Sequence, residues 1–336
     1  MAFYETMKLE KGMYAVSGKS FTQVLEELDP SRNYKGTDLE GLDAYQRQLK
    51  RFDIKVSGEN CDTVEKFFQT SESAALFPEF VSRAVQQGID RANKLSNLVA
   101  TVTKIDASDY RTITATDGTS IGTAVTEGGA LPETVIQNQS GLVTMKKHGR
   151  LIKSSYEALR FHKLDLFAVM LRHIGEEIVR EQIVEAATVL YSGDGNDNAA
   201  AKTTLSAAPT YNDLLGLWAK LSPFELNTMV ASTATMKDLL SITEFKDAVA
   251  GLNFQGTGSI GTPMGANLIH VPSFTDGIVV GFDKNCALEM VQAGEILVDY
   301  DKLIDRQMEC ASISAICGFA KIYPNAVHAL SYTISK

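Results

Sequence analysis

One stretch of the chain has a long helical pattern of apolar and polar positions. Over residues 165–191, apolar side chains recur three and four positions apart, beginning with Leu166 and Met170, and this spacing predicts one helix about 40 Å long. A Ser-Gly-Asp-Gly sequence at 192–195 ends it. The opposite face is charged and is predicted to be solvated: Arg172, Glu176, Glu177, Arg180, Glu181 and Glu185.

The first part of the chain predicts short helices on a polar segment. Ser20 and Gln23 form a capping box before TQVLEEL, and Thr37 and Glu40 form a second box that opens a helix through DLEGLDAYQRQLKRF. We interpret residues 1–72 as an N-terminal arm rather than a compact domain. The second helix has one apolar stripe, which is expected to pack on the main body or on another subunit: Leu39, Leu42, Tyr45, Leu49 and Phe52.

The main body is predicted to start with a helix at LFPE, where Pro78 suits the first turn.

The pattern then changes over residues 101–153. TKIDASDYRTITATDG and SGLVTMKKHGRLIKSS alternate as strands do, and the intervening AVTEGGALPETVIQNQ is rich in Gly and polar residues. This predicts a long two-stranded arm that lies on a neighbour, because an isolated ribbon is only marginally stable. Ser154 and Glu157 form a further capping box before the long helix.

The rest of the chain alternates short helices and strands. Between residues 206 and 300, helical TYNDLLGLWAKL and ATMKDLLSITEFKDAVA are interspersed with strand-like NTMVAS, ANLIHVPS, GIVVGF and ALEMVQ, which predicts a second compact α+β unit. CASISAICGFAKIY predicts a long strand that rejoins the main body.

Composition and charge exclude several classes of function. The chain has 336 residues, 44% of them hydrophobic, which suffices for two modest domains. A net charge of -9 argues against electrostatic binding to the phosphates of nucleic acids. Any nucleic acid near the protein is therefore expected to be enclosed rather than bound. The four cysteines lack metal-ligand spacing and are expected to be reduced thiols. We expect neither a signal peptide nor a membrane span.

Candidate chemical motifs are weak. Gly256, Gly258 and Gly261 form a GxGxxG, but Pro263 follows at once and no helix opens to receive a pyrophosphate, which favours a surface loop. The acidic turn at 194–198 lacks the final Glu of a calcium loop. The five histidines are scattered, and no GxSxG is present. We therefore expect no enzyme, with no catalytic, cofactor-binding or metal-binding residues. The glycine loop leaves one alternative hypothesis open, in which the chain is a soluble α+β enzyme or a ligand-binding protein.

Four stretches together resemble the Hong Kong 97-type major capsid protein of tailed bacteriophages, over roughly residues 73–330. LFPEFVSRAVQQG resembles the entry helix, and AVTEGGALPET with SGLVTMKKHGRLIKSSYEAL resembles the extended loop and its return strand. HKLDLFAVMLRHIGEEIVREQIVEAATVLYSGDGN resembles the spine helix. GTPMGANLIHVPS, GIVVGFDKNCALEMV and DRQMECASISAICGFAKIYPNAVHAL resemble the axial domain and closing strands. None of these stretches is a short invariant signature, so the resemblance is specific because of their order and spacing together.

The resemblance implies an α+β Hong Kong 97-like capsid fold with an N-terminal arm, an extended β-ribbon loop, a peripheral domain with a long spine helix, and an axial domain. The expected boundaries follow this order: 1–72 N-terminal arm; 73–100 entry helix of the peripheral domain; 101–153 extended loop; 154–205 spine helix of the peripheral domain; 206–300 axial domain; 301–336 C-terminal strands returning to the peripheral domain.

The resemblance also implies a function. The chain would be a structural subunit that assembles into hexamers and pentamers of an icosahedral phage head around double-stranded DNA, in the virion after assembly in the cytoplasm of the host bacterium. Scaffolding, portal and decoration proteins would be further partners. The alternative within the fold is an encapsulin-like cellular compartment. Expected subunit contacts, for which simple solubility is the alternative role, are Arg111, Glu127, Glu133, Lys146, Lys147 and Arg150.

Two departures from the family pattern narrow the expectation. Some family members cross-link subunits through a lysine in the extended loop, but no lysine stands between Lys104 and Lys146, so we expect noncovalent contacts. Many relatives begin with a long scaffolding segment that a protease removes, whereas about 70 residues precede the entry helix here. We expect either a separate scaffolding protein or a retained arm.

Overall fold

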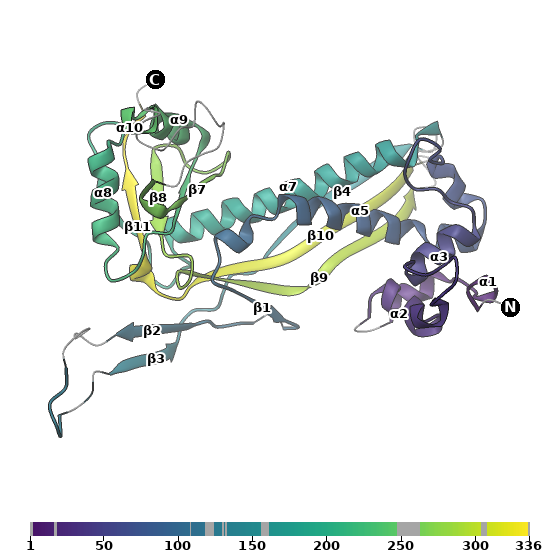
Figure 1. Cartoon of the computed structure of the whole chain (residues 1–336), viewed down its shortest axis with the longest axis horizontal. Helices are drawn as coiled ribbons and strands as arrows, with labels where there is room; N and C mark the ends of the chain where they lie inside the picture. The colour runs from purple at the N-terminus through teal and green to yellow at the C-terminus, as the bar shows by residue number, and fades with distance from the viewer. Residues whose placement is uncertain are drawn as a thin grey trace. The chain divides into compact units, whose positions relative to one another are not determined.

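A computed structural model describes residues 3–16, 19–107, 109–117, 124–129, 131, 133–155, 161–246, 263–303 and 308–334. The chain forms two compact units (Figure 1). Unit 1 comprises residues 1–92, 149–178 and 296–314, and unit 2 comprises residues 93–148, 179–295 and 315–336. Four long elements contribute residues to both units: β4 (Lys146–Ser155), α7 (Leu164–Ser192), β9 (Leu288–Leu303) and β10 (Met308–Lys321).

Unit 1 begins with short α-helices, and a buried ion pair joins the end of the second to the third. These helices are α1 (Phe3–Thr6), α2 (Phe21–Leu28), α3 (Ala44–Arg51) and α4 (Ser71–Ala74). Arg47 Nε lies 2.7 Å from Asp29 Oδ2, and both side chains are fully buried. The Arg47 guanidinium also donates to the Leu42 carbonyl oxygen and lies over the Tyr34 ring. A charge pair withdrawn from water needs such additional partners. The segment predicted to be an arm rather than a compact domain therefore has a buried interior of its own.

The capping predictions had mixed outcomes. The Ser20–Gln23 box is present, and α2 ends at Leu28 with Asp29 as its C-cap. The second box was wrong: α3 begins at Ala44, and its cap is Asp43 with Gln46. Tyr45 and Leu49 of the predicted stripe are buried within unit 1, where Tyr45 Oη donates to the Leu76 carbonyl oxygen. Leu39 and Leu42 precede α3 and are only partly buried, so they are not part of a helical stripe. The predicted box of Ser154 depends on Glu157, which lies outside the described residues.

The predicted entry helix is present as α5 (Phe77–Ala92), and it crosses α7 at two glycines. A methyl group on Gly88 would collide with the carbonyl oxygen of Arg172, and one on Gly175 would collide with the carbonyl oxygen of Val85. Each helix thus presents a glycine where the backbone of the other passes. The close approach depends on the absence of a side chain at both positions.

The long helix α7 is confirmed, but its surface differs from the prediction in two places. Leu166 and Met170, expected on the buried face, are 52% and 48% exposed. Glu185, expected on the solvated face, is buried. The apolar face was derived from helical spacing alone, and spacing does not show where along its length a helix is covered.

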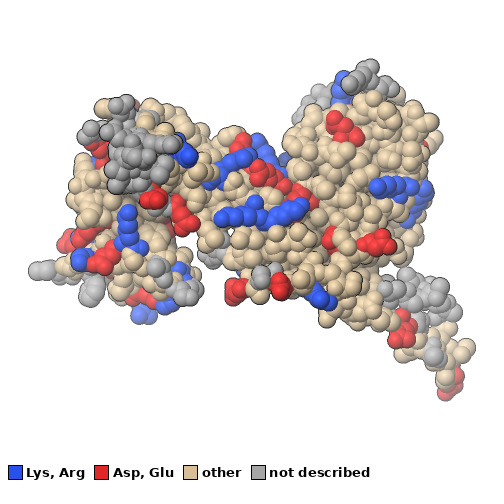
Figure 2. Space-filling model, turned by 180° about the vertical axis from the view of Figure 1, so that it is seen from behind, with Lys and Arg blue, Asp and Glu red and all other residues tan. Residues whose placement is uncertain are grey.

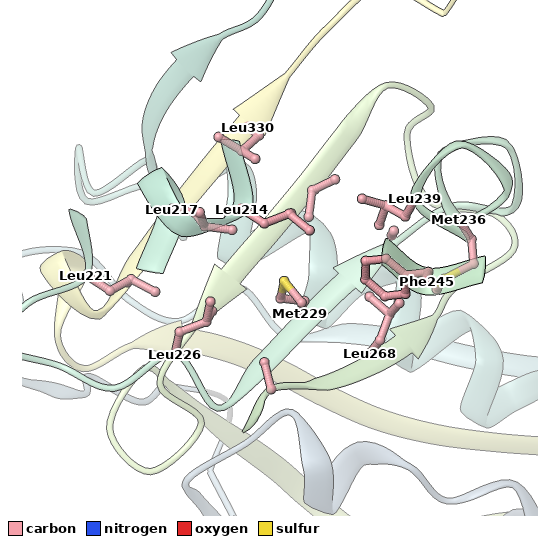
Figure 3. Close-up of a cluster of buried hydrophobic side chains, with 13 residues drawn as sticks. Leu214, Leu217, Leu221, Leu226, Met229, Met236, Leu239, Phe245, Leu268 and Leu330 are labelled. Atoms are coloured by element: carbon pink, nitrogen blue, oxygen red, sulfur yellow. The ribbon is translucent and has the colours of Figure 1, made fainter. Parts of the chain in front are cut away.

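Unit 2 contains a five-stranded sheet with the order β5-β11-β8-β6-β7. Its strands are β5 (Ala201–Thr204), β6 (Thr228–Ala231), β7 (Asn267–His270), β8 (Ile278–Phe282) and β11 (Val327–Ser331). The predicted helices are present as α8 (Tyr211–Lys220) and α9 (Thr233–Ser241), followed by the short α10 (Thr243–Lys246). Side chains of all three helices and of the sheet form one buried core (Figure 3). The predicted helices and the strands NTMVAS, ANLIHVPS and GIVVGF are present, but β5 and β11 come from outside residues 206–300, and ALEMVQ leads into β9, which belongs to another sheet.

The predicted two-stranded ribbon is present, but its return strand was misplaced. β2 (Ile113–Asp117) pairs antiparallel with β3 (Thr134–Asn138) and forms a separate two-stranded sheet. Residues 146–155, expected to form the return strand, instead form β4 in a four-stranded sheet with the order β1-β9-β10-β4. β1 (Thr101–Ile105) belongs to the same sheet. The GxGxxG at 256–261 lies outside the described residues.

We predict that Gly88→Ala and Gly175→Ala each lower the free energy of unfolding by about 1–3 kcal/mol, because the added methyl group overpacks the crossing of α5 and α7. Chemical denaturation measures the effect. The matched control is Gly216→Ala in α8, where an added methyl group meets nothing within 4 Å. There the higher helix propensity of alanine should raise stability by about 1 kcal/mol. Stabilisation by all three substitutions would contradict the close crossing.

Candidate inter-subunit interface

The ribbon formed by β2 and β3 has several apolar side chains that are exposed to solvent. Ile113 and Ile136 are 52% and 66% exposed, and Leu131, in the connection between the strands, is 79% exposed. Among the described residues, these two strands pair only with each other. Because exposed apolar groups on an unsupported strand pair invite association, the ribbon is the strongest candidate for a surface that binds another chain.

A buried carboxylate holds the chain that leads into the ribbon. Glu289 of β9 is 5% exposed and accepts hydrogen bonds from the hydroxyls of Thr103, Tyr110 and Thr112. Burial, together with the hydrogen bond to Glu289, raises the pKa of Tyr110. Three donors compensate the desolvation of one carboxylate, and all three belong to the segment that precedes or begins the ribbon.

The chain that leaves the ribbon is held at the end of β10. Gln139 is 6% exposed; its backbone N–H donates to the Thr112 carbonyl oxygen at 2.9 Å, and its Nε2 donates to the Lys321 carbonyl oxygen at 2.6 Å. Thr114 Oγ1 donates to the Ile322 carbonyl oxygen at 3.0 Å. The base of the ribbon is therefore buried and polar, whereas its outer part is exposed and apolar.

Lys321 itself is buried at this base. Its side chain is fully inaccessible to solvent, and its Nζ donates to the Asn198 carbonyl oxygen at 2.8 Å. Burial lowers the pKa of the Lys321 ammonium to about 8, although the nearby Asp194 carboxylate acts in the opposite direction. Neither Glu289 nor Lys321 was predicted from the sequence. The signal available was a lone charge within an apolar strand, in ALEMVQ and in GFAKIY.

All six predicted contact residues are exposed: Arg111, Glu127, Glu133, Lys146, Lys147 and Arg150. Lys146 and Arg150 have partners within the chain: Lys146 Nζ lies 3.1 Å from Glu185 Oε1, and Arg150 Nε lies 3.4 Å from Glu177 Oε2. Acidic and basic side chains of the described residues are interspersed on the face in Figure 2. A contact role for the six residues stays a prediction.

Other candidate residues have ordinary partners. His148 Nε2 lies 2.6 Å from Glu185 Oε2, and His328 Nε2 lies 2.8 Å from Thr203 Oγ1. His270 Nε2 lies 2.9 Å from Thr233 Oγ1, and burial lowers the pKa of His270. The described residues contain no group of His, Cys, Asp and Glu side chains arranged to hold a metal ion. No described helix has the length and apolarity needed to cross a membrane.

Comparison with known proteins supports the resemblance. Residues 138–294 match the family model described as phage capsid protein. A virus-like particle from Pyrococcus furiosus has a similar structure, with a TM-score of 0.52 and 14% identity over 75% of this chain and 98% of that chain. The capsid of an empty GTA particle aligns with a TM-score of 0.51 and 15% identity over 72% of this chain and 90% of that chain. No curated protein matches the sequence.

These matches confirm the predicted resemblance to phage capsid proteins and the α+β, Hong Kong 97-like fold. At such identities the structural likeness shows the fold alone. The division of the chain into six segments at the predicted boundaries stays a prediction.

Lys321 gives the stability a specific pH dependence. Because its pKa is about 8 in the folded chain and near 10.5 when exposed, the unfolded state binds more protons between these pH values. The stability of the protein relative to a Lys321→Met variant should therefore rise between pH 8 and 10.5, by roughly 2 kcal/mol. Urea denaturation of both proteins at several pH values measures this, and the other titrating groups cancel in the difference. A difference that falls or stays constant would contradict the buried ammonium.

Proposed function

We propose that this chain is the major capsid protein of a tailed phage, a structural subunit that forms hexamers and pentamers of an icosahedral head enclosing double-stranded DNA. The observation that carries the proposal is the ribbon of β2 and β3, with apolar side chains on its outer part and a buried, hydrogen-bonded base. Such a ribbon gains stability when it lies on an adjacent subunit, because burial removes its apolar surface from water.

The proposed contacts between copies are heterologous: a ribbon on one subunit covers a different surface on the next. Contacts of this kind close into rings when the rotation between subunits permits. Axial domains, which we identify with the α+β part of unit 2 around β6 and β8, would meet at the symmetry axes. Arg111, Glu127, Glu133 and Lys147 are exposed and are available for such contacts.

The proposed relation to DNA is enclosure without sequence recognition. The net charge of -9 and the interspersed acidic and basic side chains support this, because binding to phosphates requires clustered positive charge. Scaffolding, portal and decoration proteins are proposed as partners of the assembling head, which would form in the cytoplasm of the host bacterium. The retained N-terminal arm is supported by the buried Asp29–Arg47 pair within unit 1.

An encapsulin-like compartment is the second candidate, favoured by the structural likeness to a virus-like particle from Pyrococcus furiosus. Electron microscopy of the purified chain, with a scaffolding protein supplied where assembly needs one, tests the shared proposal of a shell. Closed particles are expected, and persistent monomers under all assembly conditions would contradict both candidates. Particles isolated from cells separate the two, because a phage head contains a packaged genome and a compartment contains a cargo protein.

Removing the outer ribbon should block assembly and leave the fold intact. Thr114 and Gln137 face each other in the ladder, so residues 115–136 can be replaced by Asn-Gly, which forms a two-residue hairpin turn. The base residues remain in place. We expect circular dichroism and the melting temperature to stay close to those of the full chain, while particle yield falls at least tenfold. Normal particle yield from the folded variant would contradict the role of the ribbon.

A narrower variant tests the apolar contacts alone. Leu131→Thr and Ile136→Thr together replace two side chains that are 79% and 66% exposed, so they should not destabilise the free subunit. Particle assembly should require a higher protein concentration than for the unmodified chain, measured by light scattering. A matched control is Leu28→Thr, which alters a 47% exposed leucine at the end of α2, outside the proposed interface.

A further inference from the structure

The turn that follows α7 has an unusual backbone. Gly193, Gly195 and Asp197 all have positive φ angles, of 88°, 97° and 56°. Side chains within the turn stabilise this conformation: Asp194 Oδ1 accepts from the Asn196 N–H at 3.1 Å, and Asn198 Oδ1 accepts from the Asp194 N–H at 3.0 Å. The composition that suggested a calcium loop therefore serves hydrogen bonds within the turn.

One side chain of this turn reaches the base of the ribbon. Asn196 Oδ1 accepts a hydrogen bond from the Gly141 N–H at 2.7 Å, and Asn196 Nδ2 donates to Gln139 Oε1 at 2.8 Å. A methyl group on Gly141 would lie 2.6 Å from Asn196 Oδ1, so the approach requires glycine there. Both functional atoms of the Asn196 amide are thus occupied by the two residues through which the chain leaves β3.

The same turn is tied to β10 by Lys321. The Lys321 N–H donates to Asp194 Oδ2 at 2.8 Å, and its Nζ donates to the Asn198 carbonyl oxygen at 2.8 Å. The Lys321 carbonyl oxygen accepts from Gln139 Nε2. Turn, ribbon and β10 are therefore linked in a closed set of hydrogen bonds, and Gln139 and Lys321 are both buried within it.

We infer that Asn196 is a positioning residue for the ribbon: through Gln139 and Gly141 it sets the direction in which β2 and β3 extend from the rest of unit 2, before a neighbouring subunit binds. The inference rests on the proposed role of the ribbon and adds a residue that controls it. A two-stranded ribbon cannot hold its own direction in water. Ordering it only on contact would cost binding free energy, which a ribbon held in advance does not lose.

The test begins with Asn196→Ala in the full chain, followed by amide hydrogen exchange of the unassembled protein. The substitution leaves Gln139 Oε1 and the Gly141 N–H without their partner. Loss of these bonds should speed exchange at residues 134–143 by about five- to tenfold. The matched control is Thr210→Ala, which removes the cap of α8 and leaves the turn untouched. In that control, exchange should rise in α8 and not in the ribbon.

A double-mutant cycle distinguishes positioning from general destabilisation. Gln139→Ala and the double variant Asn196→Ala/Gln139→Ala complete the cycle. If the two side chains act as one contact, the double variant should exchange little faster at β3 than either single variant. Additive effects, or exchange at β3 that matches the unmodified chain in Asn196→Ala, would overturn the inference.

Assembly provides a readout that a merely structural role would not change. Asn196→Ala should form particles at least several-fold more slowly than Thr210→Ala at the same melting temperature, and equal rates would overturn the inference. Failure of the unmodified chain to form particles would refute the proposed function instead. The exchange measurements on free subunits would then still decide whether Asn196 holds the ribbon.

Discussion

The architecture of unit 2 depends on the need to satisfy two charged groups buried at the base of the ribbon. Glu289 and Lys321 lie in strands surrounded by apolar side chains, where an uncompensated charge is strongly unfavourable. The partners of the Glu289 carboxylate come from the segment that leads into the ribbon, and the partner of the Lys321 ammonium comes from the turn after α7. The segment leading into the ribbon cannot separate from β9 without leaving the Glu289 carboxylate unpaired. A local requirement of hydrogen bonding thus anchors the most extended part of the protein.

This anchoring explains how the outer ribbon can remain apolar. The stability of β2 and β3 does not have to come from their own pairing, because the residues at their base are held by the sheet beneath. The exposed side chains are then free to be selected for contact with another chain, although an exposed strand pair also carries a risk of unspecific association. The proposed shell resolves this conflict, since each ribbon would be covered in the assembly.

Several features followed from the sequence, and their failures have identifiable causes. The cap at Ser20 was predicted correctly because a capping box is a local interaction of four residues. The box at Thr37 failed because Asp43 offers a competing cap, and the packing of Tyr45 and Leu49 selects the shorter helix. The return strand was misplaced because alternation predicts a strand without showing its partner: residues 146–155 alternate well, but they pair in another sheet.

The sequence by itself determined the helices α5, α7, α8 and α9, the cap at Ser20 and the resemblance to capsid proteins, because periodicity and local signals are properties of neighbouring residues. Only the tertiary structure decided that Gly88 and Gly175 meet, that Glu185 is buried and that Asn196, Gln139 and Lys321 form one network. These residues are far apart in the chain. Their contacts arise from the packing of whole elements, which no local pattern of residues encodes.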